Sequence, residues 1–252
     1  MNLHTTGHKA IIAPLTPTDL VDVLALQETA RALLPAEMKG FVPVQSVAYF
    51  QNMLSDITGQ MIGIRCEGRL VAHISVIGPM ELREAIAMRL ITNNDIPFHH
   101  ATLTDTIIVL ANKLTHPDWR GYGFGAALLE AAMSLPLAQT SDHIFAQIPV
   151  GDRRSWDAYM RQGFGIVAAG YEPQDKHPHF ILQKPAFGFD FSPAIIADEV
   201  DPSEDFSAIV NLTKREALVG VFEAPEATTL SFMRNREAST LMPTVAKLKA
   251  SV

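Results

Sequence analysis

Hydrophobic positions in the first part of the chain alternate between two spacings, and each change of spacing predicts a change of secondary structure. Residues 11–13 form a short apolar run that predicts a strand, and apolar side chains at helical spacing over residues 20–26 predict a following helix. Residues 60–66 and 70–77 are rich in β-forming residues and flank Glu67-Gly68-Arg69. This spacing predicts an antiparallel hairpin with a glycine turn.

The middle of the chain passes from a strand through a glycine-rich turn into a helix. A helix is predicted over residues 81–90, followed by a loop. Residues 104–114 are rich in β-branched side chains and predict a buried strand, which Pro117 ends. From Gly121 the apolar spacing becomes helical and continues to Pro136. The glycines of the turn therefore stand at the start of a helix.

Further strands and one helix complete this part of the chain. Residues 143–150, 165–169 and 180–183 predict strands, and a helix closed by Gly163 lies between the first two. The order of the elements predicts an α/β (α+β) fold, with a mixed, mainly antiparallel sheet flanked by helices.

The sequence changes character after Pro185, where an aromatic and glycine-rich stretch leads into an acidic one. We therefore predict one domain over residues 1–185 and a C-terminal extension over residues 186–252. The extension is expected to be helical, with one helix starting near Asp201-Pro202 and another towards the C-terminus.

Composition and charge narrow the class of protein. The chain has 252 residues, of which 48% are hydrophobic and 19% are charged, as in soluble globular proteins. Its formal net charge of −7 disfavours a nucleic-acid partner. The sequence contains neither an apolar run of about 20 residues nor an apolar leader at the N-terminus, so we expect no membrane partner and a cytoplasmic location.

Cysteine and histidine give little indication of a metal site. Cys66 is alone, which excludes an intramolecular disulfide and a cysteine metal cluster. It falls in the predicted strand over residues 60–66, where a structural role is favoured over a nucleophilic one. His177 and His179 stand at strand spacing, but no carboxylate or cysteine partner is evident near them. We expect no metal.

The turn after the buried strand contains Arg120, Gly121, Gly123 and Gly125. Glycines let the backbone approach a ligand, and the first N–H groups of a helix lack partners within it. Together with the helix dipole and the charge of Arg120, this arrangement favours a pyrophosphate. The spacing differs from the dinucleotide fingerprint, and no Gly-Lys-Ser/Thr follows as in a P-loop. Taken alone, the pattern fits a packing turn equally well.

A longer segment carries a family resemblance. Residues 114–129, with the sequence Leu-Thr-His-Pro-Asp-Trp-Arg-Gly-Tyr-Gly-Phe-Gly-Ala-Ala-Leu-Leu, closely resemble the coenzyme A-binding motif of the GNAT superfamily of acyltransferases. Residues 159–164 resemble the second signature of that family, a helix that ends in Tyr-x-x-x-Gly-Phe. The resemblance covers about residues 10–185 and implies a GNAT-like fold.

The resemblance also implies roles for the matching residues. It assigns the pyrophosphate to backbone N–H groups from Gly121 to Ala126, and the pantetheine arm to the strand that ends at Thr115. The cofactor-binding residues implied in this way are Leu114, Thr115, His116, Arg120, Gly121, Tyr122, Gly123, Phe124, Gly125 and Ala126. Tyr159 falls where the family often places a general acid for the departing thiolate, and it also fits a plain apolar-face aromatic. Thr115 and Asp152 depart from the family pattern, in which an aliphatic residue and Asn are usual.

The general base is less clearly indicated. Asp105 lies near the start of the central strand, where the family often has a carboxylate, although a loop or edge carboxylate is the competing interpretation. His99 and His100 lie in the loop before that strand and titrate near neutrality, as solvated loop histidines also do.

These features predict an N-acetyltransferase that uses acetyl-CoA and acts on a small amine or amino-acid-like acceptor. A protein or peptide N-acetyltransferase and a non-catalytic coenzyme A-binding regulator are the alternatives, because the fold alone does not choose among them. The extension over residues 186–252 is expected to cover the acceptor site as a lid or to pair two subunits in a homodimer.

Overall fold

The structure is a computed structural model of the chain and describes most of its first 186 residues and parts of the remainder. The described residues are 2–5, 8–35, 39, 42, 44–88, 90–91, 101–171, 178–186, 196–200, 207, 210, 218–224 and 227–233.

The chain folds into two compact units, and both are discontinuous in sequence. The first unit contains Met1–Met80 and Ile107–Ser141, and the second contains Glu81–Thr106 and Asp142–Val252. The domain boundary expected between residues 185 and 186 stays a prediction.

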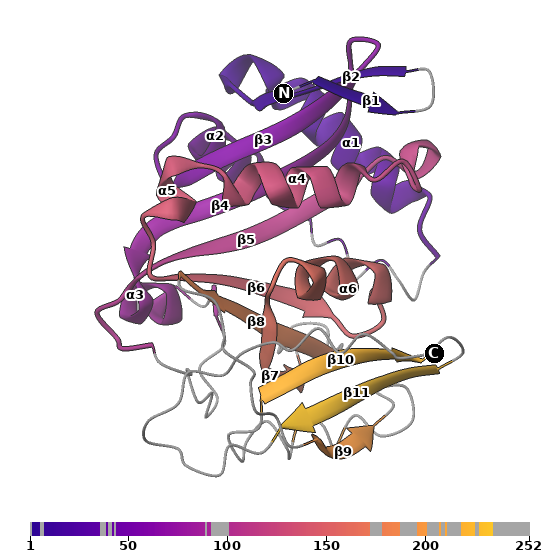
Figure 1. The fold of residues 1–252 in the computed structure, drawn as a ribbon. Coiled ribbons are helices and arrows are strands. Elements are labelled where there is room, and N and C mark those ends of the chain that lie inside the picture. The colour runs from indigo at the N-terminus through magenta and orange to yellow at the C-terminus, as the bar shows by residue number, and fades with distance from the viewer. Residues whose placement is uncertain are drawn as a thin grey trace. The chain divides into compact units, whose positions relative to one another are not determined.

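The first unit is built on a sheet whose strands follow one another in chain order (Figure 1). These strands are β1 (Asn2–Thr5), β2 (His8–Pro14), β3 (Gly59–Cys66), β4 (Arg69–Glu81) and β5 (Thr106–Thr115). The pairs β1–β2, β2–β3 and β3–β4 are antiparallel. All the strands predicted in this part of the chain are present, and β1 is an addition to them.

The hairpin between β3 and β4 closes through Glu67 and Gly68. Their φ angles are +52° and +82°, so both residues adopt the left-handed conformation that a two-residue hairpin turn requires. The predicted antiparallel hairpin is confirmed.

Helices cover both faces of this sheet (Figure 1). Helix α4 (Phe124–Met133) lies across the front face in this view, whereas α1 (Leu20–Ala32) and α2 (Val47–Leu54) lie behind it. Each buries apolar side chains, as a helix packed on a sheet must. Pro136, expected to end the run, instead begins a short separate helix, α5 (Pro136–Gln139), because proline is well tolerated in the first turn of a helix.

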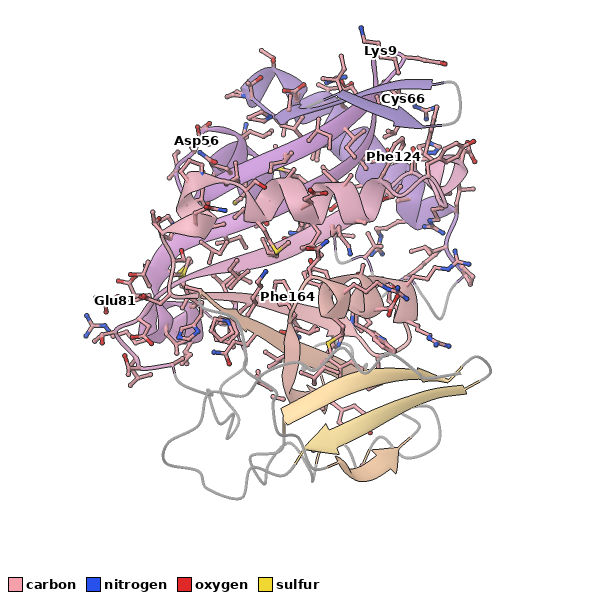
Figure 2. The ribbon with its side chains drawn as sticks, viewed as in Figure 1. Lys9, Asp56, Cys66, Glu81, Phe124 and Phe164 are labelled. Atoms are coloured by element: carbon pink, nitrogen blue, oxygen red, sulfur yellow. The ribbon has the colours of Figure 1, made fainter. Side chains whose placement is uncertain are left out.

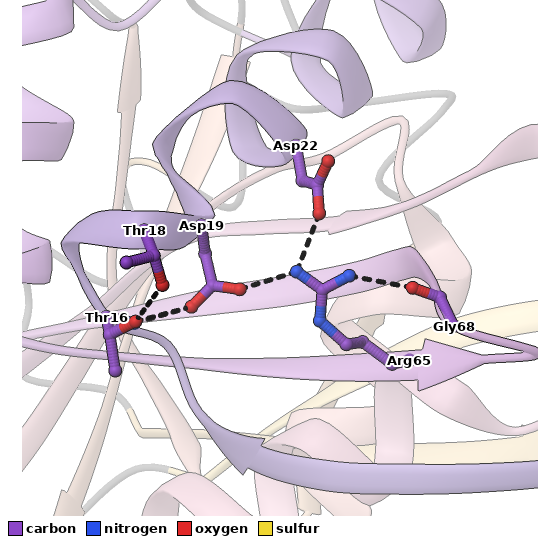
Figure 3. Close-up of polar contacts among 6 residues, drawn as sticks. All are labelled: Thr16, Thr18, Asp19, Asp22, Arg65 and Gly68. Atoms are coloured by element: carbon purple, nitrogen blue, oxygen red, sulfur yellow. Dashed lines mark hydrogen bonds and ion pairs between the residues drawn. The ribbon is translucent and has the colours of Figure 1, made fainter.

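An ion-pair network fixes the start of α1 to the hairpin (Figure 3). One Nη atom of Arg65 lies 2.5 Å from Asp19 Oδ1 and 2.6 Å from Asp22 Oδ2, and the other donates to the Gly68 carbonyl at 2.9 Å. Asp19 also accepts from the Thr16 backbone N–H at 2.7 Å. The start of α1 is thus bound to the neighbouring strand β3.

The second unit begins its sheet in the order β6, β8, β7. These strands are β6 (His143–Pro149), β8 (Pro178–Pro185) and β7 (Gly165–Tyr171), and β8 is antiparallel to both neighbours. Helix α6 (Arg153–Arg161) connects β6 to β7 and ends before Gly163, whose φ of +87° suits a residue just past a helix. The unit also contains α3 (Leu82–Ala87). The α/β (α+β) class, with a mixed, mainly antiparallel sheet flanked by helices, is confirmed.

The described part of the C-terminal extension consists largely of strands. They are β9 (Ile196–Val200), β10 (Leu218–Ala224) and β11 (Ala227–Met233), and β10 pairs with β7 through Val219 and Ile166. The expectation of a helical extension is wrong for these residues, whose runs of β-branched and aromatic side chains favour strands. Ser207 and Val210 are helical, and the rest of the helix predicted near Asp201 lies outside the described residues.

No helix among the described residues is both long enough and apolar enough to cross a membrane.

Candidate functional site

The glycine-rich turn of the first unit joins the end of β5 to the start of α4. A short 3-10 helix, η3 (Pro117–Trp119), follows the strand, and the exposed Arg120 follows η3. Gly121 and Gly123 have φ angles of +89° and +78°, which side-chain-bearing residues rarely adopt. The turn therefore depends on glycine at these two positions.

The start of α4 presents unpaired backbone donors. The first hydrogen bond of the helix runs from the Ala127 N–H to the Gly123 carbonyl at 3.1 Å, so the N–H groups of the residues before Ala127 lack partners within the helix. A Cβ added at Gly121, Gly123 or Gly125 would meet no atom within 4 Å. The turn thus has open space beside donors at the positive end of a helix dipole, which fits a pyrophosphate.

Three aromatic side chains brace this turn. The ring of Trp119 stacks on that of Phe124 with centroids 6.1 Å apart, and Tyr122 lies 5.6 Å and 6.0 Å from these two rings. Phe124, labelled in Figure 2, is 1% exposed and anchors the first turn of α4 in the core. The predicted cofactor residues of this turn therefore have two roles. The glycines leave open space beside the backbone, and the rings of Tyr122 and Phe124 support the turn.

His116 also belongs to this turn, and it is buried. Its Nε2 lies 2.8 Å from an Nη atom of Arg69, and its Nδ1 lies 3.2 Å from the Asp118 backbone N. The Asp118 backbone N–H donates to Nδ1, so the His116 side chain caps η3. Burial lowers the pKa of His116, and the charges of Arg69 and Arg120 lower it further. His116 is thus a buried cap of η3 that also contacts Arg69.

Tyr159 lies on α6 in the second unit. It is 2% exposed and packs edge-on against Phe164 with ring centroids 5.1 Å apart. Burial raises the pKa of its phenol, and the charge of Asp152 raises it further, so the hydroxyl keeps its proton at neutral pH. This state suits a proton donor, and the ring packing also suits a core aromatic; the acid role stays a prediction. Asp152 itself caps α6 by accepting from the Ser155 N–H at 3.2 Å.

Asp105 precedes β5 and holds a local structure together. Its carboxylate accepts from the Thr102 backbone N–H at 2.8 Å and from the Thr102 hydroxyl at 2.6 Å, and it lies 3.2 Å from His143 Nε2. Burial alone raises the pKa of Asp105, but the bonds to Thr102 and His143 outweigh it and lower the pKa. A carboxylate with a lowered pKa is a weak base, so this geometry favours the structural interpretation. The base role stays a prediction.

The other residues considered from the sequence show no metal chemistry in the part of the chain that the structure describes. Cys66, labelled in Figure 2, is fully buried, and burial and the charge of Glu67 raise the pKa of its thiol. Such a thiol is a poor nucleophile. His179 is buried in β8, and no group of three His, Cys, Asp or Glu side chains gathers among the described residues. His99, His100 and His177 lie outside those residues.

One group of polar residues was missed from the sequence. Asn112 on β5 is hydrogen-bonded to Gln45 and to Tyr49, which come from the segment containing α2. The signal that could have indicated it is the interruption of the apolar run of β5 by Asn112 and Lys113.

Comparison with known proteins identifies the fold. Neither models of protein families nor curated proteins match the chain. Among solved structures, it is similar to a GNAT-family acetyltransferase from Streptococcus pneumoniae, with a TM-score of 0.50 and 14% identity over 70% of this chain and 98% of the other. An N-acetyltransferase from Staphylococcus aureus Mu50 gives a TM-score of 0.51 at the same identity and coverage. The structure of NAA60 from Arabidopsis thaliana in complex with acetyl-CoA gives a TM-score of 0.51. The identity is 14% over 71% of this chain and 99% of the other.

The fold and the turn define the class of protein. The chain has the fold of the GNAT superfamily of N-acetyltransferases, as its two sequence motifs indicated. At this identity the likeness establishes the fold, and the activity depends on the site.

Proposed function

We propose that the chain is an N-acetyltransferase that takes its acyl group from acetyl-CoA. The observation that carries the proposal is the turn over Gly121–Ala126, which has open space beside its glycines and whose first α4 N–H groups lack partners within the helix. These donors lie at the positive end of a helix dipole, which suits a pyrophosphate.

Charge at the turn supports the same donor. Arg120 is exposed beside the glycines, and Arg69 lies 2.8 Å from the His116 ring of the same turn. Guanidinium groups bind phosphate oxygens through several donors. We propose that these two side chains complete a pyrophosphate site whose centre is the backbone of the turn.

Acetyl-CoA, when bound, supplies a thioester with an activated acyl carbon and a thiolate leaving group. In the overall transfer a C–N bond forms, the C–S bond breaks and one proton passes from the amine to the sulfur. The phenol of Tyr159 is protonated at neutral pH and is the proposed donor of that proton.

The proposed acceptor is a small amine. A non-catalytic coenzyme A-binding regulator is the second candidate, favoured by the lowered pKa of Asp105, which leaves the predicted base weak. A protein or peptide acceptor is the third, and it has no specific support from the described residues.

Thiol release from acetyl-CoA over a panel of amines tests the proposal. We expect turnover with the wild type and none with Gly123→Glu, because the new side chain fills the space in front of the turn and adds a negative charge. Gly170→Glu is the control, since a Cβ at Gly170 also meets open space but Gly170 lies in β7. Equal turnover by Gly123→Glu and Gly170→Glu would place the phosphates elsewhere.

A further inference from the structure

A chain of uncharged polar residues crosses the helix-covered face of the first unit. Gln27 on α1 accepts from the Gln45 backbone N–H at 2.9 Å and donates to its carbonyl at 3.3 Å. The side chain of Gln45 then donates to Asn112 Oδ1 at 3.2 Å, and Asn112 Nδ2 donates to the Tyr49 hydroxyl at 2.8 Å. These bonds join α1, α2 and β5 through side chains that are neutral at every ordinary pH.

Asn112 is the unusual member of this group. Its φ of +48° is left-handed, although it lies inside β5, where strand residues are extended. Asn tolerates this conformation better than most residues, but it still has a cost that the surroundings must offset. Gln45 and Tyr49 hold the Asn112 amide in place and so fix the backbone at this point of the strand.

His73 adds a buried group without a partner. It lies on β4 and is 1% exposed. Its ring packs edge-on against that of Phe50 of α2, with ring centroids 6.1 Å apart. Neither of its ring nitrogens has a hydrogen-bond partner among the described residues. Burial lowers the pKa of His73 to about 4, so the imidazole is neutral and offers one donor and one acceptor. A buried donor or acceptor without a partner destabilises the fold, and a bound polar ligand would remove that penalty.

His73 and the Asn112 group are neighbours. Phe50, which contacts His73, follows Tyr49 in α2, and the two aromatic rings are 5.3 Å apart. Ser75 stands two residues after His73 on the same strand and approaches the Tyr49 hydroxyl closely enough to influence its pKa. Because alternate residues of a strand share a face, His73 and Ser75 both face α2.

Asn112 lies on β5, the strand that leads into the donor turn. Asn112 lies three residues before Thr115, so it is about 10 Å back along the strand from the start of the turn. An extended arm that leaves the turn and follows β5 passes Asn112. This step depends on the proposed function, because only that function places such an arm here.

We propose that Gln45, Tyr49, His73 and Asn112 form the acceptor-binding site, and that it selects a small primary amine bearing a neutral hydrogen-bonding group such as a hydroxyl or carboxamide. Gln45, Tyr49 and Asn112 are half-buried and form its outer part, and His73 forms its inner part. Amide, phenol and imidazole groups both donate and accept, which suits a hydroxyl or carboxamide. None of the four carries a charge to pair with a carboxylate or a second ammonium group, whose desolvation would then be uncompensated. Amine transfer also requires the neutral amine, which an uncharged environment favours.

Steady-state kinetics of thiol release from acetyl-CoA with matched acceptors test this inference. Ethanolamine and glycinamide supply neutral groups, glycine supplies a carboxylate and 1,3-diaminopropane supplies a second cation. We expect kcat/KM for the first two to exceed that for the last two at least about tenfold, since an unpaired buried charge costs more than one hydrogen bond. A preference for glycine or the diamine would overturn the proposal.

Two variants test whether these residues determine the selectivity for the acceptor. Tyr49→Phe keeps the ring and removes the hydroxyl, and Asn112→Ala removes the amide. Each should lower kcat/KM for ethanolamine about tenfold and leave the Kd of coenzyme A unchanged. Gln139→Ala is the control, because Gln139 also makes a side-chain hydrogen bond, to the Met133 carbonyl, but lies in α5. Should Asn112→Ala fail to fold, Tyr49→Phe decides the test.

The outcomes separate this inference from the proposed function. A wild type that does not bind coenzyme A overturns both. Coenzyme A binding without turnover of any amine overturns this inference and favours the regulator. Turnover with kcat/KM unchanged in Tyr49→Phe overturns this inference alone.

Discussion

Single polar side chains in this molecule act mostly by fixing other groups in place. Arg65 binds two carboxylates of the α1 start and a carbonyl of the hairpin, and His116 caps η3 by accepting from the Asp118 backbone N–H. Asp105 has the same character, since its oxygens are engaged by Thr102 and His143. This structural role of Asp105 could not be predicted from the sequence. A carboxylate at the start of a strand has the same sequence pattern whether it stabilises a loop or activates an amine.

The Asp19–Arg65 pair should make stability depend on pH. Burial raises the pKa of Asp19, but hydrogen bonds from Thr16 and Arg65 outweigh it, and the folded pKa lies below the unfolded value of about 3.9. A lowered folded pKa adds stability above the unfolded pKa, and that stability is lost as the pH falls through the folded pKa. We expect Asp19→Asn to reduce the free energy of unfolding by about 1 kcal/mol at pH 7 and by less at pH 3.

Urea unfolding of both proteins between pH 3 and pH 7 measures this difference. Glu130→Gln, on the exposed side of α4, is the control and should track the wild type throughout. A deficit in Asp19→Asn that is as large at pH 3 as at pH 7 would show that the carboxylate charge is not responsible.

Tyr159 gives the second test at this scale. Tyr159→Phe keeps the ring against Phe164 and removes the proton that we propose is donated to the thiolate. Thiol release should fall about 100-fold while the Kd of coenzyme A stays constant. Tyr171→Phe, at a tyrosine that is 58% exposed, should have no effect. Equal rates for the two variants would leave Tyr159 as a core aromatic.

At the scale of elements, the parts with strong local patterns were predictable. The succession of β5, turn and α4 follows from a β-branched run, closely spaced glycines and a change to helical spacing. Helix α2 was not predicted because it is only eight residues long. It is stabilised by the Ser46 cap and by burial of Phe50, Met53 and Leu54. The strands of the extension were missed although β10 and β11 pair as neighbours in sequence, and the contact of β10 with β7 joins distant parts of the chain.

The β3–β4 hairpin offers a stability test of an element. Glu67 adopts a φ of +52°, where Asn is better tolerated, and Asn-Gly is the preferred pair in this kind of turn. We expect Glu67→Asn to raise the free energy of unfolding by about 0.5 kcal/mol. Thermal unfolding checks the sign, with Glu130→Asn in α4 as a control that should lower stability slightly. A lower melting temperature for Glu67→Asn would contradict the turn geometry.

At the scale of the whole molecule, the two sequence motifs fall in different units. Residues 114–129 belong to the first unit and residues 159–164 to the second. The donor turn and the polar group around Asn112 share the first unit. That group joins residues 27, 45, 49 and 112, and no local pattern links positions so far apart in the sequence. The turn proposed to bind the donor was therefore predictable from the sequence, whereas the proposed acceptor site required the fold.

The central claim is that the turn over Gly121–Ala126 binds the pyrophosphate of coenzyme A. Calorimetric titration of coenzyme A into the wild type and into Gly123→Glu tests it most directly. We predict saturable binding by the wild type and its loss in Gly123→Glu, with binding retained in Gly170→Glu. No binding by the wild type at millimolar coenzyme A, or undiminished binding by Gly123→Glu, would contradict the claim.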